Sequence, residues 1–215
     1  MNKIIVFDTG TGGKIFAEYF RQEIQGAEII EVIDSANAPY GSRTPSEILT
    51  LTEQTLKPYI NTSALIAIAC NTATAYALSY LRTKYPDQLF VGAEPAVKPA
   101  VRLTKNGKAL ILATPATVNS AHYQNLKTKH AKHVTLYEPN CADWAQKIDD
   151  GTLTKGDIIA TLDPYRPFSP DTIILACTHY LAISPRTFTD IFPNARIYSP
   201  LPAVTDHIKS LLPQQ

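Results

Sequence analysis

Two cysteines stand in the same local setting, and their type and spacing could perform acid–base chemistry. Cys70 follows an apolar run at 64–69 and Cys177 follows one at 172–176, and small polar residues come next in both places. Such runs predict buried strands, so each thiol would lie at a strand end just before a helix. A helix N-terminus lowers the pKa of a thiol and favours the thiolate. We therefore predict that the two thiols face each other across a cleft and exchange protons with one carbon atom.

A single buried cysteine is usually structural, because free cysteine is among the most buried residue types. The matching settings of Cys70 and Cys177 favour a shared catalytic role instead. Cys141 has no such setting, so we expect it to be structural or to line the pocket. The odd number of cysteines favours free thiols in a reducing compartment over a disulfide framework.

Other polar residues could assist the thiols or could serve only the fold. Asp8 ends the first predicted strand and could either cap the next helix or act as a base beside Cys70. His179 could face solvent or cap a helix, or it could accept the proton of Cys177, because a thiol needs a proton acceptor to become reactive. Asn71 and the threonines at strand ends could be turn residues, or they could bind a carboxylate together with backbone N–H groups at helix starts.

Several familiar motifs are not supported. Asp8-Thr9-Gly10 also occurs in aspartic proteases, but their chemistry needs two such loops that share a proton, and the sequence has one. The glycines that follow fit neither a dinucleotide fingerprint, since Ile15 stands where a small residue is needed, nor a phosphate-binding P-loop. We find no zinc-finger spacing and no recognisable pyridoxal-phosphate lysine, and we predict no metal and no cofactor.

The elements that must position these residues form two similar series. We expect strands at 4–7, 29–33, 64–69, 89–92, 108–113, 134–137, 172–176 and 195–198, with helices between them, one of them starting at the capping box of Thr44 and Glu47. Strands that alternate with helices predict parallel sheets. Thr9 and Thr114 each follow the first strand of a half, 105 positions apart, and the two cysteines are 107 positions apart.

These two offsets predict an α/β protein of two similar lobes, each a mostly parallel sheet flanked by helices. We place the first lobe at 1–97 and the second at 98–199, and we expect 200–215 to pack back on the first. Ligands of parallel sheets bind at the carboxyl ends of the strands. The active site is therefore expected in the cleft between the lobes, where the carboxyl ends of the two sheets would face each other.

The composition of the 215 residues predicts a globular protein with an ordinary soluble core. Hydrophobic residues make up 45% and charged residues 18%, and the formal net charge is +1. Since Lys and Arg are scattered, nothing indicates a nucleic-acid or membrane surface. The N-terminus has too few apolar residues for a signal-peptide core, and no run approaches the roughly 20 residues that span a bilayer. We expect a cytoplasmic protein. The sequence does not specify its oligomeric state, and a homodimer is compatible with it.

With these residues assembled, the chain resembles the glutamate racemases, which belong to the cofactor-independent aspartate/glutamate racemase superfamily. The motifs that carry the resemblance run from end to end and are Phe7-Asp8-Thr9-Gly10-Thr11-Gly12-Gly13, Ala38-Pro39-Tyr40-Gly41-Ser42, Cys70-Asn71-Thr72-Ala73, Glu94-Pro95-Ala96, Thr114-Pro115-Ala116-Thr117 and Cys177-Thr178-His179-Tyr180. The histidine after the second cysteine favours the glutamate branch, because aspartate racemases typically have Glu there.

The resemblance implies a role for each site residue. Cys70 and Cys177 would stand on opposite faces of the α-carbon of the substrate, one removing the proton and the other returning it. Asp8 would assist Cys70, and His179, backed by Asp149, would assist Cys177. The residues that would bind the carboxylates and amino group of the substrate are Thr9, Tyr40, Gly41, Asn71, Thr72, Thr114, Thr117 and Thr178.

The chain departs from the family pattern in four places. Thr9 replaces Ser, Asp149 replaces Glu, and the segment Ala142-Asp143-Trp144 replaces a more aliphatic one that contains proline, which could reshape the pocket. The chain also ends sooner after Cys177 than is usual. We predict a racemase that interconverts L- and D-glutamate and supplies D-glutamate for peptidoglycan. The alternatives are a racemase of aspartate or another amino acid, and an idle two-lobed protein that binds a dicarboxylate, although such a protein has no use for paired thiols.

Overall fold

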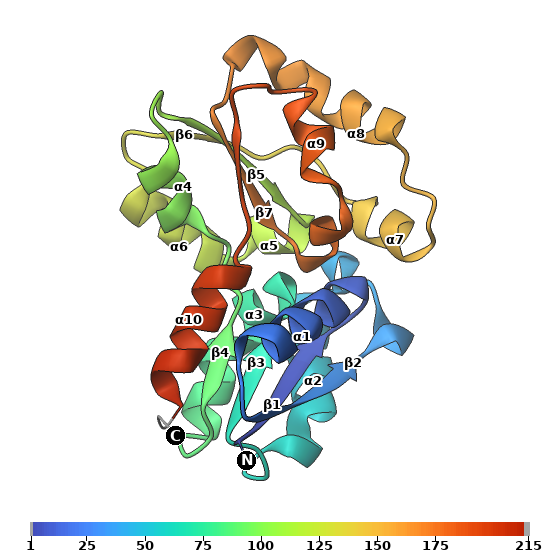
Figure 1. Cartoon of the computed structure of the whole chain (residues 1–215), viewed down its shortest axis with the longest axis vertical. Helices are drawn as coiled ribbons and strands as arrows, with labels where there is room; N and C mark the ends of the chain where they lie inside the picture. Colours follow the sequence, from blue (N-terminus) through green and yellow to red (C-terminus); the bar gives the residue numbers. More distant parts are fainter. Residues whose placement is uncertain (1, 213–215) are drawn as a thin grey trace.

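The computed structural model describes residues 2–212, and within them the chain forms two parallel sheets of four strands each, flanked by helices (Figure 1). The elements of the first half are β1 (Asn2–Asp8), α1 (Thr11–Glu23), β2 (Ala27–Ile33), α2 (Pro45–Leu56), β3 (Leu65–Ile68), α3 (Asn71–Lys84) and β4 (Phe90–Gly92). Those of the second half are α4 (Val97–Leu103), β5 (Lys108–Ala113), α5 (Pro115–Asn119), α6 (Ala121–His130), β6 (Thr135–Tyr137), α7 (Trp144–Asp149), α8 (Lys155–Leu162), β7 (Thr172–Ala176), α9 (Pro185–Thr189) and β8 (Arg196–Tyr198), followed by α10 (Leu201–Leu211). Short 3₁₀ turns lie between these elements: η1 (Ser35–Asn37), η2 (Tyr40–Ser42), η3 (Lys57–Tyr59), η4 (Asp163–Phe168) and η5 (Thr178–Ala182).

The two sheets have the same topology. Their strand orders are β2-β1-β3-β4 and β6-β5-β7-β8, and all neighbouring strands are parallel. Because Phe7 pairs with Ile68, continuation of the register brings Thr9 beside Cys70. In the second sheet Ala113 pairs with Ala176, which brings Thr114 beside Cys177 in the same way. The predicted class, an α/β protein with two similar lobes, is confirmed.

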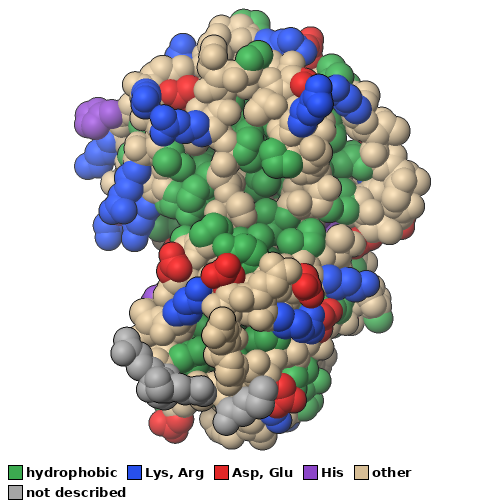
Figure 2. All heavy atoms as spheres, viewed as in Figure 1, with side chains coloured by type: hydrophobic (Ala, Val, Ile, Leu, Met, Phe, Trp, Pro, Cys, Tyr) green, Lys and Arg blue, Asp and Glu red, His purple; other side chains and the backbone are tan. Residues whose placement is uncertain are grey.

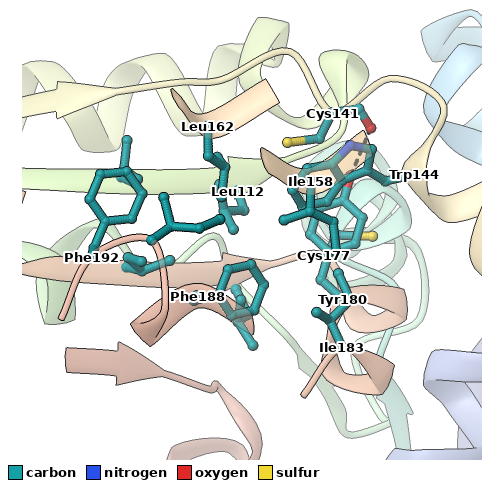
Figure 3. Packing of buried hydrophobic residues seen from close by; sticks show 14 of the residues in the cluster. Leu112, Cys141, Trp144, Ile158, Leu162, Cys177, Tyr180, Ile183, Phe188 and Phe192 are labelled. Carbon is teal, nitrogen blue, oxygen red and sulfur yellow. Dashed lines mark hydrogen bonds between the residues drawn. The ribbon is translucent and has the colours of Figure 1, made fainter. Parts of the chain in front are cut away.

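The apolar runs become strands because both faces of each sheet are covered by helices. In β1, the side chains of Ile5 and Phe7 face the α2 and α3 side, whereas those of Ile4 and Val6 face the α1 and α10 side. The second sheet alternates likewise between a core with α7, α8 and α9 and a core with α4 and α6. Figure 3 shows the first of these cores, in which Trp144 lies edge-on to Tyr180 with ring centroids 5.3 Å apart.

Two short segments join the lobes, between β4 and α4 and between β8 and α10. Helix α4 packs against α6 and β7 of the second lobe, and α10 returns to pack against α1 and β4 (Figure 1). Figure 2 shows hydrophobic side chains gathered at the waist between the lobes, with charged side chains of both signs spread above and below. In the described part of the chain, no helix combines the length and the apolar character needed to cross a membrane.

The structure differs from the expected elements after both second-lobe motifs. The helix expected after Thr114 is interrupted at Ser120, which caps a second helix, α6. Cys177 is followed by the 3₁₀ turn η5 and not by an α-helix. Pro185 explains this second difference, because its ring would collide with the carbonyl of Leu181 and it disfavours helical geometry at the residue before it. A helix that started at Thr178 would therefore have to end before Ser184, which leaves room for little more than the 3₁₀ turn, and α9 starts at the proline itself.

Candidate active site

The two predicted thiols meet in one cavity between the lobes. Cys70 lies at the N-cap of α3 and Cys177 at the end of β7, and each residue is only 6% exposed. Both line a small cavity of about 10 Å³, which is close to the space that one water molecule needs. Strand ends of separate lobes therefore place two sulfur atoms around the same small space.

Most of the predicted substrate-binding residues line this cavity too. The predicted residues in its wall are Thr9, Tyr40, Gly41, Cys70, Asn71, Thr72, Thr114, Cys177, Thr178 and His179. Thr117 lies one contact behind, since its hydroxyl is 3.2 Å from that of Thr72. Asp149 also lies one contact behind, against His179, and Asp8 precedes Thr9 at the end of β1 and is fully buried.

The pKa of the Cys70 thiol is raised, which is opposite to the expected effect of a helix start. Burial is the largest cause, and the carboxyl group of Asp8 adds to it. The N–H of Ala73 donates to Cys70 Sγ over 3.4 Å, and this bond lowers the pKa, but by less. A helix start by itself would lower the pKa, but the removal of the thiol from water raises it by more. Cys70 can therefore lose its proton only when a neighbouring group takes it.

Asp8 is the carboxyl group whose charge acts on the Cys70 thiol. Its Oδ1 accepts the N–H of Thr9 over 2.6 Å, and its buried Oδ2 has no hydrogen-bond partner among residues 2–212. Burial raises the pKa of Asp8, although His179 acts in the opposite direction. A buried carboxyl group of raised pKa is suited to accept and return a proton.

His179 bridges the second thiol and a carboxylate. Its Nδ1 lies 3.8 Å from Cys177 Sγ, and its Nε2 lies 3.0 Å from Oδ2 of Asp149. Burial opposes the charged imidazolium, but Cys177, Asp8 and Asp149 outweigh it and raise the pKa of His179 to about 10. The pKa of Asp149 is lowered, because hydrogen bonds from Thr11 and His179 outweigh its partial burial. The histidine therefore carries a proton at neutral pH.

Stability is expected to fall as the pH rises towards 10, through His179. The folded protein holds this proton with a pKa of about 10, against 6.5 for an unperturbed histidine. The stabilisation is therefore complete below pH 6.5 and is lost as the pH rises through the folded pKa. The slope from one such group is at most about 1.4 kcal/mol per pH unit. Urea unfolding of the wild type and of His179→Gln across this range measures the effect, and equal pH dependence of the two would contradict it.

Three threonine hydroxyls connect the lobes on one side of the cavity. The hydroxyl of Thr72, from α3, lies 2.9 Å from that of Thr114 and 3.2 Å from that of Thr117, and these two are 3.0 Å apart. Nearby, the hydroxyl of Tyr76 donates to the carbonyl of Ala116 over 2.8 Å, again from the first lobe to the second. The three hydroxyls satisfy one another, and a bound carboxylate could replace these contacts.

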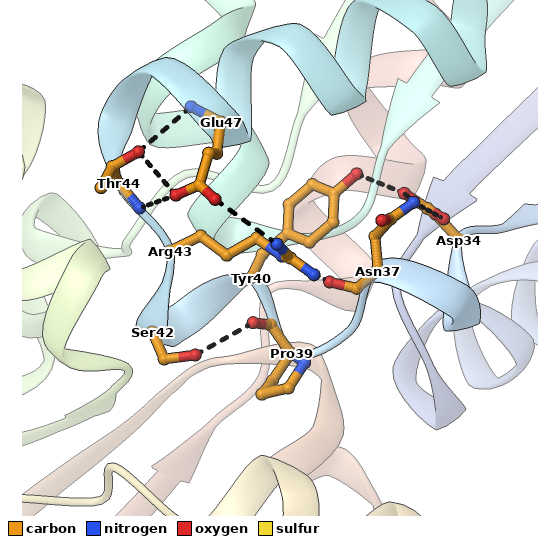
Figure 4. Close-up of polar contacts among 8 residues, drawn as sticks. All are labelled: Asp34, Asn37, Pro39, Tyr40, Ser42, Arg43, Thr44 and Glu47. Atoms are coloured by element: carbon orange, nitrogen blue, oxygen red, sulfur yellow. Dashed lines mark hydrogen bonds and ion pairs between the residues drawn. The ribbon is translucent and has the colours of Figure 1, made fainter.

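Tyr40 reaches the cavity without offering its hydroxyl. That group donates to Oδ2 of Asp34 over 2.6 Å, and Asn37 donates to the same carboxylate (Figure 4). Arg43 fixes the loop in turn, because its Nε donates to the carbonyl of Asn37 over 2.6 Å. Burial raises the pKa of the phenol, and the bond to Asp34 adds to it. Tyr40 can therefore shape the site with its ring and its backbone, and the network holds its loop in place.

The structure adds three residues that the sequence reasoning did not single out. Pro39 and Ala145 line the cavity, and Thr11 donates two hydrogen bonds to Asp149. Thr11 lies inside a motif that the sequence did display, whereas nothing marked Ala145. Its neighbour Trp144 packs in the core and is not part of the cavity wall, so the side chain that meets the cavity from this segment is a small one.

Comparison with known proteins decides the family. The model of the Asp/Glu/Hydantoin racemase family matches residues 14–208. The chain belongs to the Asp/Glu/hydantoin racemase family. A glutamate racemase of a Sulfurovum species is 37% identical over 186 residues, which cover 83% of this chain and 70% of the relative. One from Aliarcobacter butzleri is 39% identical over 192 residues, covering 85% and 73%.

Solved structures of this racemase family share the fold. Escherichia coli glutamate racemase in complex with L-glutamate and an activator has a TM-score of 0.88 and 26% identity, over 98% of this chain and 82% of that one. Francisella tularensis glutamate racemase in complex with D-glutamate has a TM-score of 0.85 and 25% identity, over 98% and 80%. The resemblance read from the motifs is thereby confirmed at the level of family and fold.

Proposed function

We propose that this racemase-family protein interconverts L- and D-glutamate by proton transfer at the α-carbon, with no cofactor. The observation that carries the proposal is the pair of sulfur atoms, Cys70 and Cys177, which come from equivalent strand ends of separate lobes and line one cavity. Relatives at 37% and 39% identity are glutamate racemases, and related structures hold L- or D-glutamate. The protein is accordingly an amino-acid racemase, an isomerase.

The reaction needs one base and one acid on opposite faces of the substrate. One sulfur takes the α-proton as a thiolate, which leaves a planar carbanion, and the other sulfur gives its proton to the opposite face. Asp8 receives the proton of Cys70 when Cys70 is the base, since burial otherwise holds that proton on the sulfur. His179, which carries a proton at neutral pH, stabilises the thiolate of Cys177 from Nδ1 when Cys177 is the base. Each stereoisomer then uses a different thiol as its base.

The cavity wall offers partners for each charged group of glutamate. Its hydroxyl donors are Thr9, Thr72, Thr114 and Thr178, which suit the two carboxylates together with backbone N–H groups. Asn71 donates to the carbonyl of Ala93 over 2.7 Å and has a buried Oδ1 without a partner among residues 2–212. This oxygen is an acceptor suited to the substrate ammonium group, because a buried polar atom without a partner is costly.

Glutamate enters when the lobes part. The cavity of about 10 Å³ has room for one water molecule and not for an amino acid. The two connections, after β4 and after β8, allow such a movement without unfolding either sheet. We place the lobe boundary near residues 97 and 98, with the C-terminal segment from 200 on the first lobe; residues 213–215 of that segment lie outside the described part of the chain.

Solvent exchange and a substrate panel test the proposal. In deuterated water, both L- and D-glutamate should exchange the α-proton and lose optical activity, followed by proton NMR and circular dichroism. Faster turnover of aspartate or another amino acid would reassign the substrate. Tight binding of glutamate without exchange would show a binding protein and overturn the proposal.

The cellular setting is a further part of the proposal. The three cysteines are unpaired and buried, which suits the cytoplasm, where disulfides are rare. There the enzyme would supply D-glutamate for peptidoglycan, as the family resemblance implies. A homodimer is the assembly that we propose to test, and light scattering of the purified protein measures it.

A further inference from the structure

A chain of contacts crosses from the first lobe to the sulfur of Cys177. Thr11, the first residue of α1, donates its hydroxyl over 2.7 Å and its N–H over 3.1 Å to Oδ1 of Asp149. Asp149 ends α7 of the second lobe, and its other oxygen contacts Nε2 of His179 over 3.0 Å. The opposite ring nitrogen, Nδ1, faces Cys177 Sγ over 3.8 Å. Each step in this series is a direct contact between the named groups.

Thr11 fixes the carboxylate more firmly than one hydrogen bond would. Its two donors hold Oδ1 of Asp149, so the remaining oxygen is directed at His179. Gly10, the N-cap of α1, has no side chain with which to cap that helix, and the carboxylate of the other lobe takes the place of a cap. A Cβ atom at Gly10 would lie 2.4 Å from both Asp149 Oδ2 and His179 Nε2, so the glycine permits this approach.

We propose that Thr11 is a positioning residue that orients His179 through Asp149, and that it does so only when the lobes are closed. Thr11 belongs to the first lobe, whereas Asp149 and His179 belong to the second. Opening of the lobes breaks the two bonds from Thr11 and frees the carboxylate to rotate. Closure over the substrate therefore completes the support of His179 at the moment when Cys177 must exchange a proton. This inference rests on the proposed racemase function.

Thr11→Val, which keeps the shape of the side chain and removes the hydroxyl, tests it. Turnover should fall about tenfold, as expected for the loss of one hydrogen bond to a charged group. The loss should be larger for the glutamate isomer whose α-proton exchange depends more on His179. Exchange measurements on His179→Gln identify that isomer. Thr11→Ser keeps the hydroxyl and should retain wild-type turnover. In the background of Asp149→Ala, Thr11→Val should have no further effect.

Thr104→Val is the matched control. The hydroxyl of Thr104 donates to Oδ1 of Asp171 over 2.6 Å, and the N–H groups of Lys105 and Asn106 donate to the other oxygen. Asp171 directly precedes β7, at the end opposite Cys177. This variant loses the bond to Asp171 and the one that the N–H of Lys108 donates to the same hydroxyl over 3.0 Å, both away from the site. Its turnover should therefore equal that of the wild type even if its melting temperature falls as much as that of Thr11→Val.

Wild-type turnover in Thr11→Val would overturn the proposal. So would a Thr11→Ser variant that is as slow as Thr11→Val, together with a Thr11→Val substitution that still slows turnover when Asp149 is already alanine. A wild type that exchanges neither isomer would instead refute the proposed function. In that case the Nε2–H resonance of His179 in proton NMR still decides the inference. Asp149 should slow the exchange of that proton with water in the wild type and in Thr11→Ser, but not in Thr11→Val. An unchanged resonance in Thr11→Val would refute the positioning role.

Discussion

Replacing either Cys70 or Cys177 with serine is expected to stop racemisation in at least one direction and to lower turnover by at least about 100-fold, the lower range of a general acid–base contribution. A hydroxyl is a far weaker acid than a thiol, so serine can neither hold the negative charge nor take the α-proton at neutral pH. Circular dichroism follows racemisation from each isomer, and proton NMR in deuterated water follows exchange. The two variants should differ in which isomer loses its exchange more severely, because each removes a different base.

Cys141→Ser is the control for these variants. Cys141 is also a buried, unpaired cysteine, but it is not part of the cavity wall. A buried hydroxyl costs about 1–3 kcal/mol without a partner, so this variant should melt at a lower temperature and keep its turnover. Exchange at the wild-type rate in the double variant of Cys70 and Cys177 would exclude the two-thiol mechanism.

Gly12→Ala is expected to lower kcat/KM by at least about 100-fold, since a displacement of 1 Å at a reacting centre has an effect of that size. A Cβ atom at Gly12 would lie 2.3 Å from Cβ and 2.5 Å from the carbonyl carbon of Thr178. Backbone cannot rotate away as the end of a flexible side chain can, so α1 and η5 must separate. That movement withdraws Thr178 and its neighbours Cys177 and His179 from the first lobe.

The matched control is Gly156→Ala. Gly12 and Gly156 are both the second residue of a helix, α1 and α8. Where the new Cβ atom fits, alanine in place of glycine stabilises the folded state by about 0.4–1 kcal/mol, because it restricts the unfolded chain. At Gly156 the nearest atom to the new Cβ would be Oγ1 of Thr154 at an ordinary 3.5 Å, so this variant should gain stability and keep its activity. Far-UV circular dichroism checks that both variants fold, and wild-type kcat/KM in Gly12→Ala would show that the close approach is not needed.

The two similar series of strands and helices and the positions of both thiols at strand ends could be predicted from the sequence. Apolar runs that end in cysteine or threonine are local patterns, and the burial of both sheet faces makes such runs continuous. The capping box at Thr44 and Glu47 likewise predicted the start of α2, because its bonds join residues three positions apart. The sequence predicts an α-helix after Cys177, whereas the chain forms the turn η5 there. Pro185, eight residues after Cys177, limits the length of any helix that starts at Thr178.

The motifs also singled out most residues of the cavity, but they could not reveal the contacts made across it. The bond between Thr11 and Asp149 joins residues 138 positions apart, and the approach of Gly12 to Thr178 depends on how the lobes sit together. The direction of the Cys70 pKa shift was likewise misjudged, since burial by the whole fold outweighs the adjacent helix. The sequence by itself determined which groups could move a proton and at which strand ends they stand. Only the tertiary structure decided their hydration, their partners in the opposite lobe and the size of the space between the two sulfurs, because each of these depends on the packing of one lobe against the other.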